Sequence, residues 1–166
     1  KVTAKVVSSV VAVAVIGLAA FGVIGFDANA VAPGRRMLSS MSPTFLIGPE
    51  RTAVLGAKGG SRIITMTLLG ILGLEDGMTP EQIAAMPRYH HQYLPDRIST
   101  EPGAISPAAA KALAAMGYEI SPSATNWSYF LHAVDWDRKS GALRGGADPR
   151  NPPGAARVVE KSEVRK

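Results

Sequence analysis

The stretch that decides the fold runs from Pro33 to Ile64 and reads PGRRMLSSMSPTFLIGPERTAVLGAKGGSRII. It contains two adjacent hydroxyls, Ser39 and Ser40, then two short apolar runs, and then the pair Gly59 and Gly60 directly before an apolar run of helical length. Backbone N–H groups at a glycine-rich turn that enters a helix converge and are partly unpaired, so they bind a carboxylate, a phosphate or a developing oxyanion. Chemistry is therefore expected at this corner.

Strand and helix signals alternate outward from this stretch. Phe45–Ile47 and Thr52–Leu55 predict two strands joined by a hairpin at Gly48–Arg51, and Ser61–Leu74 predicts a helix that is buried on most faces. Two further helices are predicted after the N-caps Thr79 and Ser106, each followed by proline, and three further strands are predicted at Tyr118–Ile120, Tyr129–Asp135 and Ala142–Arg144. This order favours an α+β layered domain in which helices pack on an antiparallel sheet.

Composition narrows the class of protein. With 166 residues, 46% hydrophobic and 19% charged, the chain is long enough and apolar enough to fold as one domain with a buried core. The net charge is +5, but the basic residues are scattered and their excess collects in the tail, residues 157–166, without a basic stripe that includes aromatics. This pattern argues against nucleic-acid binding. Because the chain has no cysteine, it contains neither a disulfide nor a thiolate metal site.

The N-terminal segment, residues 1–26, stands apart in composition. Lys1 and Lys5 precede an uncharged apolar run, Val6–Gly25, and an A-x-A tripeptide follows at Ala28–Ala30. This arrangement is typical of a secretory signal or a membrane span, and both place the rest of the chain in the periplasm, outside the cell or on a membrane anchor. The alternative is a pair of buried strands or a buried helix. The domain proper is predicted at residues 27–156, followed by the polar basic tail.

The amino-acid sequence resembles the small-subunit core of the gamma-glutamyltransferases (gamma-glutamyltranspeptidases, glutathione hydrolases), which are N-terminal-nucleophile hydrolases. LSSMSPT is followed about fifteen residues later by GGSRII. Four further matches come in the same order: PRYHHQYLPD at Pro87–Asp96, EPG at Glu101–Gly103, MGY at Met116–Tyr118 and GGADPR at Gly145–Arg150. The resemblance covers about Asp27 to Ala156. It implies an αββα sandwich of antiparallel sheets with covering helices, a large-subunit partner and no cofactor.

The resemblance also implies roles at the corner. In the family, the serines that match Ser39 and Ser40 hold the α-carboxylate of the γ-glutamyl group, and the amides that match Gly59 and Gly60 stabilise the oxyanion of the tetrahedral intermediate. The residues alone leave simpler alternatives open. A serine pair more often satisfies a local turn through side-chain-to-backbone hydrogen bonds, and a glycine pair more often provides a tight turn with positive φ.

Two departures from the family pattern bear on mechanism. The family's segment before LSSMSPT supplies an N-terminal threonine nucleophile that autocleavage frees. Thr3 is the only threonine before Thr44, and its neighbours do not resemble the family's cleavage site, so no nucleophile is found. In addition, the family usually has Ser-Pro before the two glycines, whereas this chain has Ala57 and Lys58. The lysine adds a cation that either reinforces anion binding or points to solvent.

The remaining candidates are expected to be structural. His90 and His91 are adjacent, and on a strand their rings point to opposite faces, which argues against a shared metal ion. Arg62 is expected to pair with a carboxylate, and Asp148–Arg150 to form a turn with an ion pair. No nucleophile elbow is present. Three aromatic residues are expected in the core or in a subunit contact: Trp127, Tyr129 and Trp136.

The function expected from the resemblance is γ-glutamyl transfer or hydrolysis in glutathione metabolism. Glutathione and related γ-glutamyl amides would react through an acyl-enzyme, with this chain supplying the carboxylate and oxyanion contacts. One alternative is a catalytically inactive, membrane-tethered or structural relative on the same scaffold, because the nucleophile is not found. Another is a specificity for cephalosporins or other amides.

Overall fold

The structure is a computed structural model that describes residues 30–37, 39–92, 94–122, 129–151 and 154–159. The expectations for Val6–Gly25, for Trp127 and for the tail beyond residue 159 lie outside the described residues. No helix in the described part of the chain combines the length and the apolar character needed to cross a bilayer.

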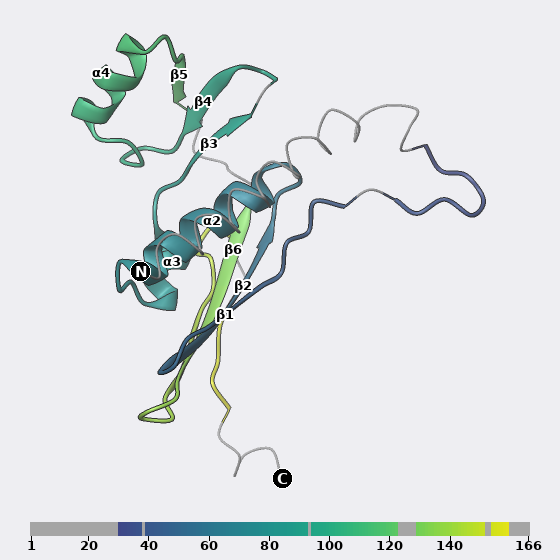
Figure 1. Cartoon of the computed structure of the whole chain (residues 1–166), viewed down its shortest axis with the longest axis vertical. Coiled ribbons are helices and arrows are strands. Elements are labelled where there is room, and N and C mark those ends of the chain that lie inside the picture. Colours follow the sequence, from purple (N-terminus) through teal and green to yellow (C-terminus); the bar gives the residue numbers. More distant parts are fainter. Residues whose placement is uncertain (1–29, 38, 93, 123–128, 152–153, 160–166) are drawn as a thin grey trace.

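A four-stranded antiparallel sheet forms the centre of the molecule (Figure 1). Its strands are β1 (Thr44–Ile47), β2 (Arg51–Lys58), β6 (Phe130–Asp137) and β7 (Leu143–Gly146), in the order β1-β2-β6-β7. The longest ladder pairs all eight residues of β2 with β6, from Arg51 opposite Asp137 to Lys58 opposite Phe130. The sheet therefore joins the start of the described chain to its end.

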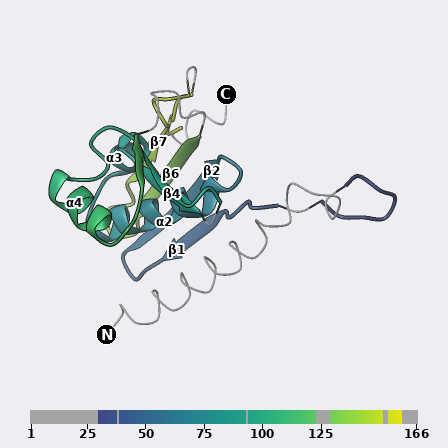
Figure 2. The same ribbon diagram turned by 90° about the horizontal axis from the view of Figure 1, so that it is seen from above.

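Helices α2 (Arg62–Glu75) and α3 (Pro80–Ala85) pack on one face of this sheet, as Figure 2 shows from above. Every second residue of β2 and β6 points toward them, and these inward side chains alternate with outward ones as a strand requires. The core consists of small and branched apolar residues from all four elements: Ala53, Leu55, Ile71, Leu74, Ile83, Leu131 and Ala133.

Local sequence signals explain where these elements begin and end. The hairpin between β1 and β2 closes where the N–H of Gly48 donates to the carbonyl of Arg51 at 2.8 Å. Thr79 caps α3 with a reciprocal pair, since its hydroxyl accepts from the N–H of Gln82 at 3.3 Å and its own N–H donates to the Gln82 side chain at 2.8 Å. The predicted hairpin, the helix at 61–74 and both proline-led helices are confirmed.

A second, smaller sheet lies beyond the N-terminal end of α2 (Figure 1). It contains β3 (Tyr89–Gln92), β4 (Arg97–Thr100) and β5 (Ile120–Pro122), and α4 (Pro107–Ala115) connects β4 to β5. This smaller sheet is mixed, because β4 pairs antiparallel with β3 and parallel with β5. Parallel neighbours need a crossover connection of this kind, and α4 supplies it. The strand predicted at Tyr118–Ile120 begins two residues later.

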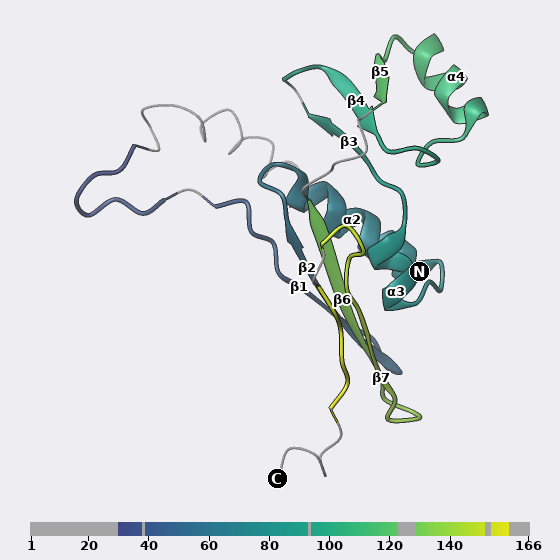
Figure 3. The ribbon, with the colours of Figure 1, turned by 180° about the vertical axis from the view of Figure 1, so that it is seen from behind.

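No helix of the described residues covers the opposite face of the four-stranded sheet, and this face exposes large apolar side chains. Phe45 and Ile47 on β1 are 68% and 71% exposed, and Val134, Trp136 and Leu143 on the last two strands are 42–45% exposed. From behind (Figure 3), residues 154–159 run past β7, and Ala156 lies against Gly145. Trp136, expected in the core or in a contact, therefore lies on an open sheet face.

Candidate functional site

The predicted corner connects β2 to α2. β2 ends at Lys58 and α2 begins at Arg62, so Gly59, Gly60 and Ser61 make the turn between them. The N–H of Arg62 donates to the carbonyl of Gly59 at 3.1 Å, and the N–H of Ile63 donates to that of Gly60 at 3.2 Å. These two bonds fix the first helical turn directly against the end of the strand, so the amides of the corner have little freedom to move.

Each glycine is required for a different reason. Gly60 has φ +54°, a left-handed conformation that side-chain-bearing residues rarely adopt. Gly59 is required by close approach, because a Cβ built on it would lie 2.8 Å from Met66 Cε and 2.8 Å from Tyr129 Cδ1. The corner is therefore wedged between α2 and the residue that precedes β6.

The structure brings the serine pair to this corner. The hydroxyl of Ser40 donates to the carbonyl of Gly60 at 2.7 Å, across twenty residues of sequence. The hydroxyl of Ser39 accepts the N–H of Met41 at 3.2 Å, which is the local turn contact that serines commonly make. The site thus has hydroxyls and glycine amides within one small region, although the Ser40 hydroxyl is already engaged by the protein.

Two cations flank the corner, each over an aromatic ring near the start of β6. The ammonium of Lys58 lies 5.4 Å from the ring centroid of Phe130, and the guanidinium carbon of Arg62 lies 4.9 Å from that of Tyr129. The carboxylate partner expected for Arg62 stays a prediction, and its guanidinium lies over an aromatic face. Positive charge on both sides of the glycines favours an anionic ligand there.

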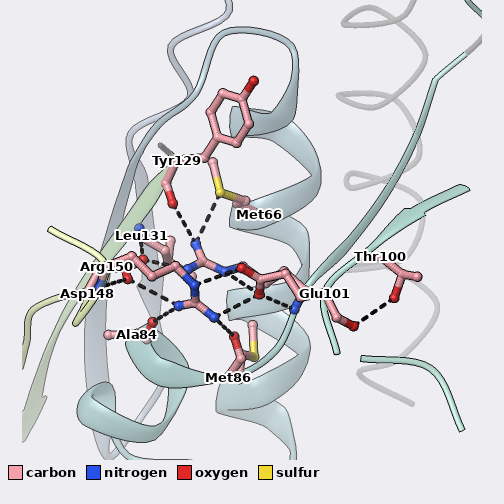
Figure 4. A network of polar contacts seen from close by, with 10 residues as sticks. Met66, Ala84, Met86, Thr100, Glu101, Tyr129, Leu131, Asp148 and Arg150 are labelled. Carbon is pink, nitrogen blue, oxygen red and sulfur yellow. Dashed lines mark hydrogen bonds and ion pairs between the residues drawn. The ribbon is translucent and has the colours of Figure 1, made fainter. Parts of the chain in front are cut away.

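A buried network of charges lies behind the corner (Figure 4). Arg88 and Asp148 are fully buried, and Arg88 Nη2 contacts Asp148 Oδ2 at 2.6 Å. Arg150 donates from Nε and Nη2 to the two carboxylate oxygens of Glu101, both at 2.7 Å, and also contacts Asp148 Oδ1 at 3.2 Å. The ion pair expected within Asp148–Arg150 is confirmed, but it is one edge of a larger network.

The network reaches the corner through Arg88. Its Nη1 donates to Met66 Sδ at 3.2 Å and to the carbonyl of Tyr129 at 3.4 Å. Met66 and Tyr129 are the same two residues that close on Gly59. Arg88 therefore contacts both residues against which Gly59 packs.

Burial and charge act against each other inside the network. Burial lowers the pKa of Arg88, although the neighbouring carboxylate of Asp148 opposes that shift. Burial alone would raise the pKa of Asp148, but the N–H groups of Leu131 and Arg150 and the charge of Arg88 outweigh it and lower that pKa. In the sequence, this cluster is marked only by the motifs PRYHHQ, EPG and DPR, which do not indicate that they meet.

The two histidines point to opposite sides of β3, as expected for neighbours on a strand. His90 is buried, with Nδ1 2.9 Å from the Thr65 hydroxyl and Nε2 2.8 Å from Gln92 Oε1, and burial lowers its pKa. His91 is exposed and contacts Asp96 at 2.8 Å. Within the described residues, no three His, Asp or Glu side chains gather at a distance suited to a metal ion.

Comparison with known proteins decides the family. The gamma-glutamyltranspeptidase family model matches residues 18–158. The chain belongs to the gamma-glutamyltranspeptidase family. It is 41% identical to the glutathione hydrolase proenzyme of Escherichia coli over 133 residues, covering 79% of this chain and 22% of that protein. It is 42% identical to the Pseudomonas aeruginosa proenzyme over 137 residues, covering 79% of this chain and 24% of that protein.

The fold agrees with this assignment. A solved structure of a highly active mutant of gamma-glutamyltranspeptidase from Pseudomonas nitroreducens superposes with a TM-score of 0.67 at 38% identity, covering 84% of this chain and 72% of that chain. The α+β fold of this gamma-glutamyltranspeptidase relative is thus that of the N-terminal-nucleophile hydrolases, as the resemblance implied. The chain spans less than a quarter of the length of the two proenzymes.

Proposed function

We propose that this chain supplies the acyl-donor half of a site for γ-glutamyl transfer or hydrolysis. Ser39 and Ser40 bind the α-carboxylate of the γ-glutamyl group, and the amides of Gly59 and Gly60 receive the oxyanion that forms when the γ-carbonyl is attacked. Glutathione and related γ-glutamyl amides are the proposed donors. Family membership supports this class of reaction, since the matched proteins are glutathione hydrolases.

The observation that carries the proposal is the contact between Ser40 and the diglycine corner. Ser40 Oγ lies 2.7 Å from the carbonyl oxygen of Gly60, so a ligand that reaches the hydroxyl also reaches the corner. To bind the α-carboxylate, the hydroxyl turns its one proton from this carbonyl to the ligand. A donor held at its α-carboxylate and at its γ-carbonyl oxygen is fixed at two points, which orients the amide for attack. Each correctly aimed oxyanion donor contributes about 3–4 kcal/mol to transition-state stabilisation.

The proposal assigns the nucleophile to a threonine outside the described residues, with its free α-amine as the base. It also assigns a partner, the large subunit, to the open face of the four-stranded sheet. The exposed side chains of Phe45, Ile47 and Trp136 support this assignment, because large apolar side chains gathered on one exposed face indicate an interaction site. A second sheet packed there would complete the αββα sandwich. We also propose that the chain is exported from the cytoplasm, as the apolar run Val6–Gly25 predicts.

The test measures release of para-nitroaniline from γ-glutamyl para-nitroanilide. The full chain is assayed alone and with a co-expressed large subunit and a separate segment that begins at the threonine, so that the threonine α-amine is free. Turnover by the complex is expected, and Ser39→Ala or Ser40→Ala should lower kcat/KM by about 10- to 150-fold, mainly through KM, because each hydroxyl bonds a charged group. Ser140→Ala in the β6–β7 turn is the matched control and should leave kcat/KM unchanged.

Three results would count against the proposal. Turnover by the chain alone would show that the nucleophile lies within it. No turnover by a folded complex would favour the alternative of an inactive scaffold. Turnover that both serine variants retain would remove the carboxylate-binding role from this corner.

A further inference from the structure

We propose that Lys58 is a specificity-determining residue that binds a second carboxylate of the substrate, on the far side of the scissile γ-amide. The carboxylate belongs either to the leaving group of the donor or to the acceptor that replaces it. This inference rests on the proposed function and names a preference of the same site: γ-glutamyl compounds whose amine half is anionic.

The position of Lys58 is set by the sheet. It is the last residue of β2, covalently next to Gly59, and its cross-strand partner is Phe130. Both side chains lie on the sheet face opposite α2 and α3. The ammonium sits 5.4 Å from the Phe130 ring centroid, a cation–π contact that holds the charge near the corner.

The charge of Lys58 is not neutralised by the described part of the protein. Three buried or half-buried arginines each contact a carboxylate: Arg51 contacts Asp135 at 2.6 Å, Arg88 contacts Asp148, and Arg150 contacts Glu101. No described carboxylate lies within 4.0 Å of the Lys58 ammonium. Its only described electrostatic contact is an aromatic face, which leaves the N–H donors of the ammonium available to an anion.

The order of groups along the corner indicates which anion this is. The Ser40 hydroxyl reaches Gly60, whereas Lys58 precedes Gly59, so the serines and the lysine flank the two amides from opposite ends of the turn. A donor with its α-carboxylate at the serines and its γ-carbonyl oxygen at the amides extends its amide nitrogen away from the serines. The amine half of the substrate then comes toward Lys58.

A simpler role for Lys58 is to cover Phe130 with its methylene stem. The variants separate the two roles: Lys58→Met keeps an apolar stem over the ring and removes the charge, and Lys58→Arg keeps the charge. Lys139→Met, in the exposed β6–β7 turn, is the matched control for loss of one positive charge at a distance.

The experiment compares two donors in the complex described above. One is γ-glutamyl para-nitroanilide, and the other is its analogue with a carboxylate meta to the amide on the leaving group. The readout is the ratio of their kcat/KM values. The ratio should fall by about two- to five-fold in Lys58→Met, as expected for a solvent-accessible ion pair, and persist in Lys58→Arg and Lys139→Met. At about 1 M salt the ratio should fall in the wild type but not in Lys58→Met.

A second arm locates the carboxylate on the acceptor. Transfer to glycylglycine is compared with transfer to glycylglycinamide, which lacks the terminal charge. A Lys58→Met effect in the donor arm assigns the leaving group, and one in the acceptor arm assigns the acceptor. Ratios that Lys58→Met leaves unchanged in both arms would overturn the inference while the proposed function stands. No turnover of either donor by the wild type would refute the proposed function, and the inference with it.

Discussion

Asp148→Asn is predicted to be among the most costly conservative substitutions in this chain. Asp148 is fully buried, and its Oδ2 accepts from Arg88 Nη2 at 2.6 Å and from the N–H of Leu131 at 2.9 Å. Its Oδ1 accepts from the N–H of Arg150 at 2.9 Å. Replacing one oxygen by an amide group turns an acceptor into a donor that faces N–H groups. The change also removes the nearest counter-charge of the buried Arg88 guanidinium.

The expected loss of stability in Asp148→Asn follows from the contacts that Arg88 retains. Its remaining carboxylate contact is Glu101 Oε2, 3.9 Å from Nε, and Glu101 is already bound in two places by Arg150. Removing one partner of a buried ion pair costs about 3–5 kcal/mol. For a chain of this length that corresponds to a fall in Tm of about 6–20 °C. Such a loss is a large part of the total stability of a typical domain, about 5–15 kcal/mol.

The assay is urea unfolding followed by tryptophan fluorescence and checked by thermal scans. Asp96→Asn is the control, because it removes the exposed ion pair with His91 and should cost at most about 1 kcal/mol. In Arg88→Met combined with Asp148→Leu, the cost should be smaller than the sum of the single costs by about 1–3 kcal/mol. If Asp148→Asn costs no more than Asp96→Asn, the reasoning about a compensated buried charge is refuted.

Three further outcomes are expected. Gly59→Ala should destabilise the chain by about 1–3 kcal/mol by urea unfolding, because its Cβ would meet Met66 and Tyr129 at 2.8 Å, whereas Gly56→Ala has open space around it and should be nearly neutral. Burial lowers the pKa of His90 below its ordinary 6.5, so the unfolded state takes up the proton first. Stability should therefore fall as pH falls below about 6.5, by at most about 1.4 kcal/mol per pH unit, and His90→Gln should flatten this slope between about pH 7.5 and 5.5; an unchanged slope would contradict it. Trp136→Ser should weaken large-subunit binding about 30-fold in sedimentation experiments while leaving the unfolding of the lone chain nearly unchanged, and equal affinity would exclude this sheet face as the contact.

Elements with local signals were predictable from the sequence, and elements that depend on distant partners were not. Thr79 followed by Pro80, with Gln82 three residues after the cap, specifies the start of α3 without help from the rest of the fold. β4, by contrast, reads Arg-Ile-Ser-Thr and has no run of apolar residues to mark it. Its place depends on pairing with β3 and β5, which propensity over four residues does not reveal.

The candidate site divides in the same way. The neighbourhood of Ser40 and the diglycine corner was expected from the sequence, and the structure places them in contact. The support behind the corner was missed, because an arginine is normally taken for a surface residue and Arg88 is fully buried. Its partner Asp148 is sixty residues away along the chain, and only the fold shows that the two meet.

This long separation has a consequence for how the protein is made. During synthesis at about 5–20 residues per second, Arg88 is added to the chain roughly 3–12 s before Asp148. In that interval the Arg88 guanidinium lacks the Asp148 carboxylate that compensates its charge in the interior. Strand β2 likewise lacks its partner strand until β6 has been synthesised. A nascent chain halted between positions 88 and 148 would therefore present its unpaired strand to chaperones and proteases.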